Sequence, residues 1–247
     1  MTPRRDRGEE RLSPIGVRYT LPSARNSAMG RPMCWCLVHA GWSISVYGAE
    51  HIPAKGAAIV AGNHTGVLDG PLLYGVCPRP VHLVTKREVF VGPVGPILRW
   101  AGHVPIERFR AVADRRALAT SLGLLADGRL LGTYPEGTRG QGDFAEIKGG
   151  LAWLALRSGA PILPLVCFGV RRPAGSVSKP APLRDHVDAV FGPLFSIEAP
   201  EPWGPYLPRR VVAKASEEIR THLVDHLTYA IELTGRSLPG SPPQVKD

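Results

Sequence analysis

His64 and Asp69 are the two side chains whose types and spacing most directly suggest chemistry. They lie five residues apart in the segment NHTGVLD, which follows the apolar run at residues 57–61. We expect that run to be a buried strand, and in open α/β sheets ligands gather just beyond the carboxyl ends of strands. A carboxylate on one imidazole nitrogen fixes the tautomer, so the pair could act as a general base on an alcohol. The spacing alone fits at least as well a loop histidine beside a helix-capping aspartate.

The segment YPEGTRG at residues 134–140 is a second candidate and also follows a predicted buried strand. Its glycines would let backbone amides approach an anion closely. Arg139 can hold phosphate oxygens in a bidentate contact, and Glu136 is unusual in a plain turn. Taken alone, the segment is equally compatible with a polar turn that contains an ion pair.

Basic residues follow two further predicted strands. Lys86 comes after residues 81–85, and Arg108 comes after residues 103–106. Each is weak evidence by itself, because basic residues at strand ends are usually solvated. Together with His64 and Arg139, they place a basic side chain at four successive strand ends, which indicates an anion-binding rim around one base.

Strand patterns alternate with helical patterns along the chain, which is typical of a layered α/β fold. The expected strands cover residues 42–47, 57–61, 81–85, 103–106, 130–134, 162–168 and 189–191. The expected helices cover residues 112–127, 151–157 and 211–233. Pro164 predicts an edge position or a bulge in its strand, because proline cannot donate to a strand ladder. We therefore expect a single α/β domain with a mostly parallel sheet of about seven strands flanked by helices.

Composition narrows the class of partner. The 247 residues carry a formal net charge of +9, which favours anionic partners such as nucleic acid, phosphorylated substrates or acidic lipid. No stretch approaches the ~20 apolar residues needed to span a bilayer, and no secretory signal pattern occurs, so we expect a cytoplasmic protein. The cysteines fit neither a disulfide framework nor the usual zinc spacing. They are interpreted as buried hydrophobic residues: Cys34, Cys36, Cys77 and Cys167.

The two ends of the chain are expected to lie outside the domain. Residues 1–30 are basic, polar and aperiodic and are predicted to form a disordered tail. The domain is expected to cover residues 31–235, with a flexible C-terminal tail at residues 236–247. Residues 30–41 combine tryptophan and aliphatic side chains with nearby arginines, which predicts a short amphipathic helix in a membrane interface. The alternative is that these residues simply cover the sheet.

Four segments resemble the motif blocks of the glycerol-phosphate and lysophosphatidate acyltransferases. NHTGVLD is similar to the NHxSxxD block, and TKREVFVGPVGPILRWAG followed by HVPIER resembles the second block. YPEGTRG is similar to the FPEGTR block, and APILPLVCFGV resembles the proline-bearing hydrophobic strand of the fourth. The blocks occur in the family's order across residues 44–170. Gly66 stands where many members have Ser, and Tyr134 stands where Phe is usual.

The resemblance implies the fold and the chemistry of a glycerolipid acyltransferase. An acyl group would move from acyl-CoA or acyl carrier protein to the free hydroxyl of 1-acyl-sn-glycerol 3-phosphate, giving phosphatidic acid. His64 would be the base and Asp69 its orienting partner. For this mechanism we also expect backbone amides near the Thr65–Gly66 turn to stabilise the oxyanion, which is an expectation apart from the resemblance. The implied acceptor-phosphate site consists of Lys86, Arg108, Glu136, Gly137, Thr138 and Arg139.

The expected partners follow from the same resemblance. They are lysophosphatidic acid or a related lysolipid, the acyl thioester donor, and the inner face of the cell membrane, where the protein would bind peripherally. We expect no metal and no cofactor beyond the acyl donor, and we expect no nucleic acid as a partner.

Other reactions and other classes of protein remain as alternatives. The same mechanism could act on another lysophospholipid or on a glycolipid acceptor. Hydrolysis by a nucleophilic serine is disfavoured because no G-x-S-x-G element occurs. Metal-dependent phosphohydrolysis would need more His and Asp ligands near His64. A nucleic-acid-binding module is disfavoured because aromatic residues are only 7% and no stacking-platform or zinc-finger motif occurs.

Overall fold

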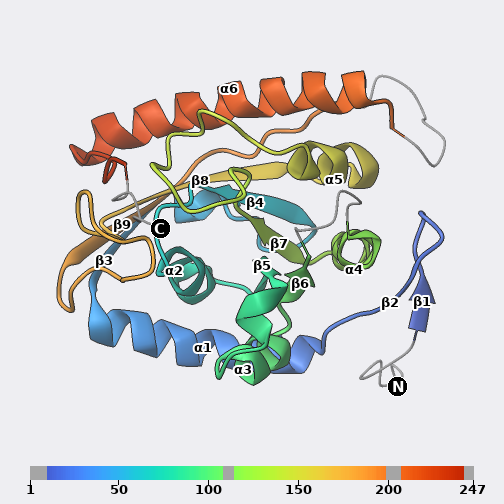
Figure 1. Cartoon of the computed structure of the whole chain (residues 1–247), viewed down its shortest axis with the longest axis horizontal. Coiled ribbons are helices and arrows are strands. Elements are labelled where there is room, and N and C mark those ends of the chain that lie inside the picture. Colours follow the sequence, from blue (N-terminus) through green and yellow to red (C-terminus); the bar gives the residue numbers. More distant parts are fainter. Residues whose placement is uncertain (1–9, 108–113, 199–206, 242–247) are drawn as a thin grey trace, which may run out of the picture.

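A seven-stranded sheet forms the centre of the fold (Figure 1). The computed structural model describes residues 10–107, 114–198 and 207–241. In sheet order, the strands are β3 (Ser43–Tyr47), β9 (His186–Phe191), β8 (Ile162–Phe168), β4 (Ala58–Gly62), β7 (Leu130–Thr133), β5 (Val81–Lys86) and β6 (Val104–Ile106). The strands from β8 to β6 are parallel, whereas β9 runs antiparallel to β8 and β3 is parallel to β9. The predicted α/β fold with a mostly parallel sheet of about seven strands is confirmed.

Helices cover both faces of the sheet (Figure 1). One layer contains α4 (Arg115–Ala126), α5 (Gly150–Ser158) and α6 (Arg209–Thr234), and the other contains α1 (Ala24–Gly41), α2 (Asp69–Val76) and α3 (Gly95–Ala101). Ile59 and Ala61 of β4 join the core beside α4, α5 and α6, whereas Ala58 and Val60 join the core beside α2. All four side chains are buried, which explains why this strand is a continuous apolar run. None of the described helices is both long and apolar enough to cross a membrane.

The sequence patterns predict every strand of the central sheet, but not the short helices α2 and α3. Pro164 lies in β8, which is paired on both sides, so the predicted edge position is wrong. Between the pairs Leu165–Phe191 and Ile162–Phe195, β8 has two residues and the opposite segment has three. The alternative prediction of a bulge therefore describes this pairing, and proline is tolerated where the ladder is irregular.

Residues 10–30, predicted to be part of a disordered tail, are folded. β1 (Glu10–Leu12) and β2 (Arg18–Thr20) form an antiparallel hairpin. Tyr19 is 7% exposed and packs on α4 so closely that a Cβ at Gly123 would lie 2.1 Å from the Tyr19 ring. The hydroxyl of Ser23 caps the first turn of α1. The prediction is wrong because a hairpin of two three-residue strands and a helix that packs through small residues carry little periodic signal.

The segment after α6, predicted to be a flexible tail, packs against the body of the domain as far as the described residues extend. Leu238 contacts the core beside α4–α6, and Pro239 is buried. The described part of the domain therefore begins before residue 31 and continues beyond residue 235. Residues 1–9 and 242–247 lie outside the described residues.

Only two of the four cysteines are buried. Cys77 and Cys167 are almost completely inaccessible, and Cys34 is partly buried. Cys36 is exposed on α1, so the prediction that it is a buried hydrophobic residue is wrong. The described residues contain no group of three or more His, Cys, Asp and Glu side chains that could hold a metal ion.

Candidate active site

The segments predicted to carry the chemistry meet at one edge of the sheet. β4, β5, β7 and β8 are parallel, so their carboxyl ends lie at the same edge. The NHTGVLD segment follows β4, residues 134–140 follow β7, and Lys86 is the last residue of β5. Because β4 pairs directly with β7, the loops that contain the first two motifs are neighbours.

His64 and Asp69 form a hydrogen-bonded pair. Nδ1 of His64 lies 2.8 Å from Oδ2 of Asp69. Asp69 begins α2 and is fully buried, whereas 20% of the His64 side chain is exposed. Because a carboxylate only accepts, we assign the imidazole proton to Nδ1, which leaves the lone pair on Nε2. The pair therefore has the geometry of an oriented general base that a substrate can reach.

The Asp69 carboxylate is also held by the main chain. Its Oδ2 accepts from the amides of Thr65 and Gly66 at 2.8 and 2.9 Å, and its Oδ1 lies 3.5 Å from the hydroxyl of Thr65. Amide donors and the N-terminal end of a helix both stabilise negative charge at such a position. The expectation that these two amides stabilise an oxyanion is wrong, because both already donate to Asp69.

The loop after β7 holds the main chain of His64. Oε1 of Glu136 accepts from the His64 amide at 3.2 Å, and the amide of Gly140 donates to the His64 carbonyl at 2.8 Å. Gly142 lies so close to Thr65 that a Cβ there would be 2.3 Å from Thr65 Cγ2, so only glycine allows this approach. Burial raises the pKa of Glu136 to about 8, against the opposing effect of the hydrogen bond from His64.

The ring of Tyr134 supports the imidazole from one side. The two rings are stacked, with centroids 4.3 Å apart and planes inclined by 16°. The Tyr134 hydroxyl is buried and has no hydrogen-bond partner among the described residues. Burial also raises the pKa of Tyr134 well above its usual range. A phenylalanine would make the same stacking contact without burying a hydroxyl, so the ring is the part of Tyr134 that serves the site.

The basic residues predicted to bind the acceptor phosphate differ in their surroundings. Arg139 is half-buried, and its Nη1 donates to the carbonyl of Val177 at 3.0 Å, so one of its nitrogens is already engaged. Lys86 is half-buried at the end of β5, two strands from β4 in the sheet order. Arg108 lies outside the described residues.

The other residues predicted for the acceptor site belong to the turn after β7. Gly137 has a left-handed φ of 79°, which favours glycine, and Thr138 is exposed. Glu136 contacts the main chain of His64, which is a structural role within the loop. A direct contact of any of the three with an acceptor stays a prediction.

The sequence patterns assign no role to two buried polar residues of the site. Asn63 is fully buried, and its side-chain amide exchanges hydrogen bonds of 3.1 and 2.8 Å with the main chain of Cys167 on β8. Arg171 is 3% exposed and donates from Nε to the carbonyl of Thr65 at 2.9 Å. Arg171 lies shortly after the end of β8. The rule that ligand sites gather beyond the carboxyl ends of strands would therefore have identified Arg171 as a candidate.

Comparison with known proteins agrees with this geometry. The profile of a protein family described as acyltransferases matches residues 43–168, which is just over half of the 247-residue chain. The chain belongs to the acyltransferase family. The matched region runs from β3 to the end of β8 and includes both motif loops.

Several curated relatives of this acyltransferase have a more specific name. A 1-acyl-sn-glycerol-3-phosphate acyltransferase of Borreliella burgdorferi is 30% identical over 131 residues, which are 52% of this chain and 52% of the relative. A protein of the same name from Bacillus subtilis is 29% identical over 128 residues, which are 51% of this chain and 63% of the relative. The matched part of the chain thus spans about half the length of the Borreliella burgdorferi protein and somewhat more than half the length of the Bacillus subtilis protein.

The fold of this acyltransferase is also found in a solved structure. The crystal structure of PlsC, the 1-acyl-sn-glycerophosphate acyltransferase of Thermotoga maritima, aligns with a TM-score of 0.56. The alignment covers 83% of this chain and 79% of that chain at 22% sequence identity. At this identity the similarity shows that the two proteins share a fold.

Proposed function

We propose that this acyltransferase transfers an acyl group to the free hydroxyl of 1-acyl-sn-glycerol 3-phosphate and so produces phosphatidic acid for phospholipid synthesis. The donor is an acyl thioester of coenzyme A or of acyl carrier protein. The observation that carries the proposal is the 2.8 Å contact between His64 Nδ1 and the buried Asp69, at the sheet edge where the motif loops meet. The names of the relatives from Borreliella burgdorferi and Bacillus subtilis support the same acceptor.

In this reaction, Nε2 of His64 takes the proton of the acceptor hydroxyl while the hydroxyl oxygen attacks the thioester carbonyl carbon. Asp69 stabilises the imidazolium that forms. When the tetrahedral intermediate collapses, the C–S bond breaks and the imidazolium returns the proton to the leaving thiolate. The products are one ester and one free thiol, so atoms and protons balance with the donor as the only co-substrate.

The acceptor is held through its phosphate. Lys86, Arg108 and Arg139 supply the positive charge, and the donors of Arg139 not directed to Val177 contact the phosphate oxygens. The exposed Thr138 adds a hydroxyl at the same loop. Anchoring the phosphate keeps the reacting hydroxyl near the base, and positioning of this kind can contribute ~7 kcal/mol or more.

A panel of acceptors tests this function. The full chain is given one acyl-CoA and, in turn, 1-acyl-glycerol 3-phosphate, other lysophospholipids and a glycolipid acceptor, with free thiol and lipid product measured together. We expect equal amounts of thiol and phosphatidic acid with the first acceptor. His64→Ala should abolish both, whereas the matched control His222→Ala, at an exposed histidine of α6, should not.

Each other outcome of the panel has a distinct meaning. Lipid product only with another lysophospholipid or with a glycolipid would overturn the proposed acceptor but keep the mechanism. Thiol release without lipid product would indicate thioester hydrolysis and would overturn the transferase.

We further propose that the protein binds peripherally to the inner face of the cell membrane through an apolar surface on α1 and α3. Met29, Met33 and Leu37 recur every four residues along one face of α1 and are 50%, 66% and 65% exposed. α3 packs beside α1, and Val94 and Ile97 add side chains that are 48% and 62% exposed. A row of exposed apolar side chains of this length marks an interaction surface, and the proposed lipid substrate favours a membrane as the partner.

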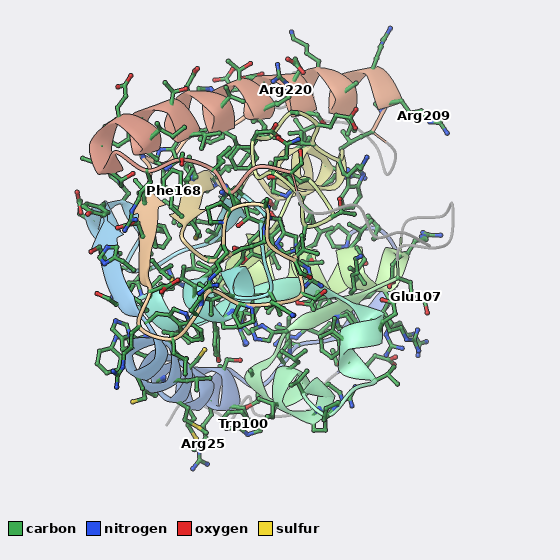
Figure 2. All side chains as sticks on the ribbon, turned by 60° about the vertical axis from the view of Figure 1, so that its left-hand side comes forward. Arg25, Trp100, Glu107, Phe168, Arg209 and Arg220 are labelled. Atoms are coloured by element: carbon green, nitrogen blue, oxygen red, sulfur yellow. The ribbon has the colours of Figure 1, made fainter. Side chains whose placement is uncertain are left out.

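The two faces of α1 differ in their surroundings. Val38 is buried against Gly75 of α2, whereas the side chains of the apolar row are exposed. Figure 2 shows Arg25 and Trp100 on the side of the molecule opposite α6. Arg25 is exposed in the first turn of α1, where it can contact anionic lipid. Arg31 contributes less to such a contact, because its Nε donates to the carbonyl of Cys77 at 2.7 Å.

Flotation with anionic vesicles tests the membrane surface. Leu37→Glu should reduce flotation strongly while changing the melting temperature little, because the side chain is 65% exposed. Leu233→Glu is the matched control, since Leu233 is 45% exposed on α6 in the other helical layer. Unchanged flotation of Leu37→Glu, or an equal loss with both variants, would overturn this surface.

A further inference from the structure

The chain turns back after α6, at the side of the molecule that contains β3 and β9 (Figure 1). Nε of Arg236 donates to Oδ2 of Asp188 at 2.8 Å, and Asp188 is 1% exposed on β9. The carbonyl of the buried Pro239 accepts from the amide of Ala174 at 2.7 Å. Residues 236–240, called the C-terminal strap below, are therefore anchored to β9 at one end and to the loop after β8 at the other.

Arg171 connects this strap to the catalytic loop. Its Nη2 donates to the carbonyls of Gly240 and Gly140 at 2.8 and 3.0 Å. Its Nη1 donates to the carbonyl of Gly175 at 2.8 Å, and its Nε donates to the carbonyl of Thr65 at 2.9 Å. One guanidinium thus joins the strap, the loop after β7, the loop after β8 and the NHTGVLD loop.

The contact with Thr65 completes the support of the catalytic loop. The amide and carbonyl of His64 are paired with Glu136 and Gly140, and the amide of Thr65 is paired with Asp69. The Thr65 carbonyl is the remaining main-chain polar group of these two residues, and Arg171 is its donor. Because the Thr65 amide donates to the same Oδ2 that contacts His64 Nδ1, a rotation of this main chain would move the carboxylate relative to the imidazole.

The burial of Arg171 explains why the strap matters for this contact. Arg171 is 3% exposed, so its donors depend on protein carbonyls for hydrogen bonds. If the strap moved away, Nη2 would lose the carbonyl of Gly240, and a buried charge with fewer acceptors would turn toward other partners. The bond from Nε to Thr65 would then be strained or lost.

We propose that Arg171 and the C-terminal strap are positioning elements that fix the Thr65 main chain and, through it, hold the Asp69 carboxylate on Nδ1 of His64. Arg171 reaches no reacting atom in this role, so it is a positioning residue. The kinetic consequence rests on the proposed function, whereas the structural consequence can be measured without any activity.

Arg236→Gln tests the strap at a distance from the catalytic loop. It removes the ion pair with Asp188, and Arg236→Lys is the matched control because it keeps the charge. We expect Arg236→Gln to lower kcat by about tenfold with little change in acceptor KM, since small misplacements of a catalytic group are costly. The acidic limb of the pH profile of kcat/KM should move to lower pH, because the imidazolium loses part of its stabilisation by Asp69. Arg236→Lys should restore most of both.

Hydrogen exchange supplies the readout that needs no substrate. The amides of Thr65 and Gly66 should exchange faster in Arg236→Gln than in the wild type, while exchange in β4 stays unchanged. Arg171→Lys should increase the exchange of these amides further, because lysine cannot reach four carbonyls at once. If Arg171→Lys fails to fold, the exchange measured in Arg236→Gln still tests the positioning role.

Two results would overturn the positioning role. The first is an unchanged kcat, pH profile and exchange rate in folded Arg236→Gln. The second is faster exchange throughout β4 as well, which would mean that the strap only stabilises the fold. A wild type that acylates none of the acceptors would overturn the proposed function instead, and the exchange experiment would still decide the role of the strap.

Discussion

Replacing Asp69 by asparagine separates the charge of this residue from its geometry. In the native site, Oδ2 accepts from His64 Nδ1 and from the amides of Thr65 and Gly66. The two amides can be satisfied only by an oxygen, so they should hold the asparagine with its carbonyl oxygen in the Oδ2 position. The Nδ1 proton of His64 then keeps its acceptor, and Nε2 keeps the lone pair that the reaction needs.

The expected loss of activity in Asp69→Asn is therefore the loss caused by removing one negative charge. An imidazolium and a carboxylate about 4 Å apart, at an effective dielectric constant of about 20, attract each other by roughly 4 kcal/mol. Losing this attraction in the transition state should lower kcat of Asp69→Asn by about a thousandfold, with little effect on acceptor KM. Asp69→Ala should in addition lower the melting temperature, because the buried amides of Thr65 and Gly66 lose their acceptor.

Three measurements on the same preparations check this reasoning. Thiol release and lipid product give kcat, nitrogen chemical shifts of His64 give the tautomer, and thermal melts give the stability. A loss in Asp69→Asn as complete as in His64→Ala, together with an inverted tautomer, would refute the argument that the amides orient the side chain. A kcat close to that of the wild type would refute the role assigned to the charge.

Three further substitutions probe the surroundings of the pair. Arg139→Lys should raise acceptor KM by roughly tenfold and donor KM much less, because lysine cannot make a planar bidentate contact; equal rises in steady-state kinetics would contradict this. Tyr134→Phe should keep activity and raise the free energy of unfolding by about 1 kcal/mol in urea melts, because the buried hydroxyl lacks a partner among the described residues; a lower stability would count against it. Glu136 has a pKa raised to about 8 in the folded state, so its contribution to stability is greatest below the usual value of 4.5 and is lost as the pH rises through 8. Relative to Glu136→Gln, the wild type should therefore lose stability over that range in urea melts, and a constant difference would contradict the shift.

The parts of the site that the sequence predicts are those that depend on local spacing or on a simple topological rule. The contact between His64 and Asp69 closes within five residues, so a single turn determines it. Lys86 and Arg139 are placed at the same edge as this pair because the strands that precede them are parallel. An apolar run followed by a polar motif is enough to predict such an arrangement.

The parts that the sequence does not predict depend on contacts between distant segments. Arg171 and Gly240 are 69 positions apart, and no local pattern indicates that they meet. The amides of Thr65 and Gly66 could equally face a substrate or a carboxylate, and only the fold of the turn into α2 directs them to Asp69. Small elements such as the β1–β2 hairpin are likewise stabilised by tertiary packing more than by their own sequence pattern.

A second histidine–aspartate pair shows which feature distinguishes the candidate catalytic pair. His186 Nε2 lies 3.0 Å from Oδ1 of the buried Asp188, a geometry close to the 2.8 Å contact of His64 and Asp69. Asp188, however, also accepts from the guanidinium of Arg236, so its charge is already balanced by a permanent cation. The other hydrogen-bond donors to Asp69 are uncharged groups of Thr65 and Gly66, and the Arg171 cation acts on Asp69 only through space, because its donors go to carbonyls. In the proposed reaction, the Asp69 carboxylate therefore has no cation hydrogen-bonded to it until the imidazolium forms, and this difference, more than the distance, distinguishes the candidate catalytic pair.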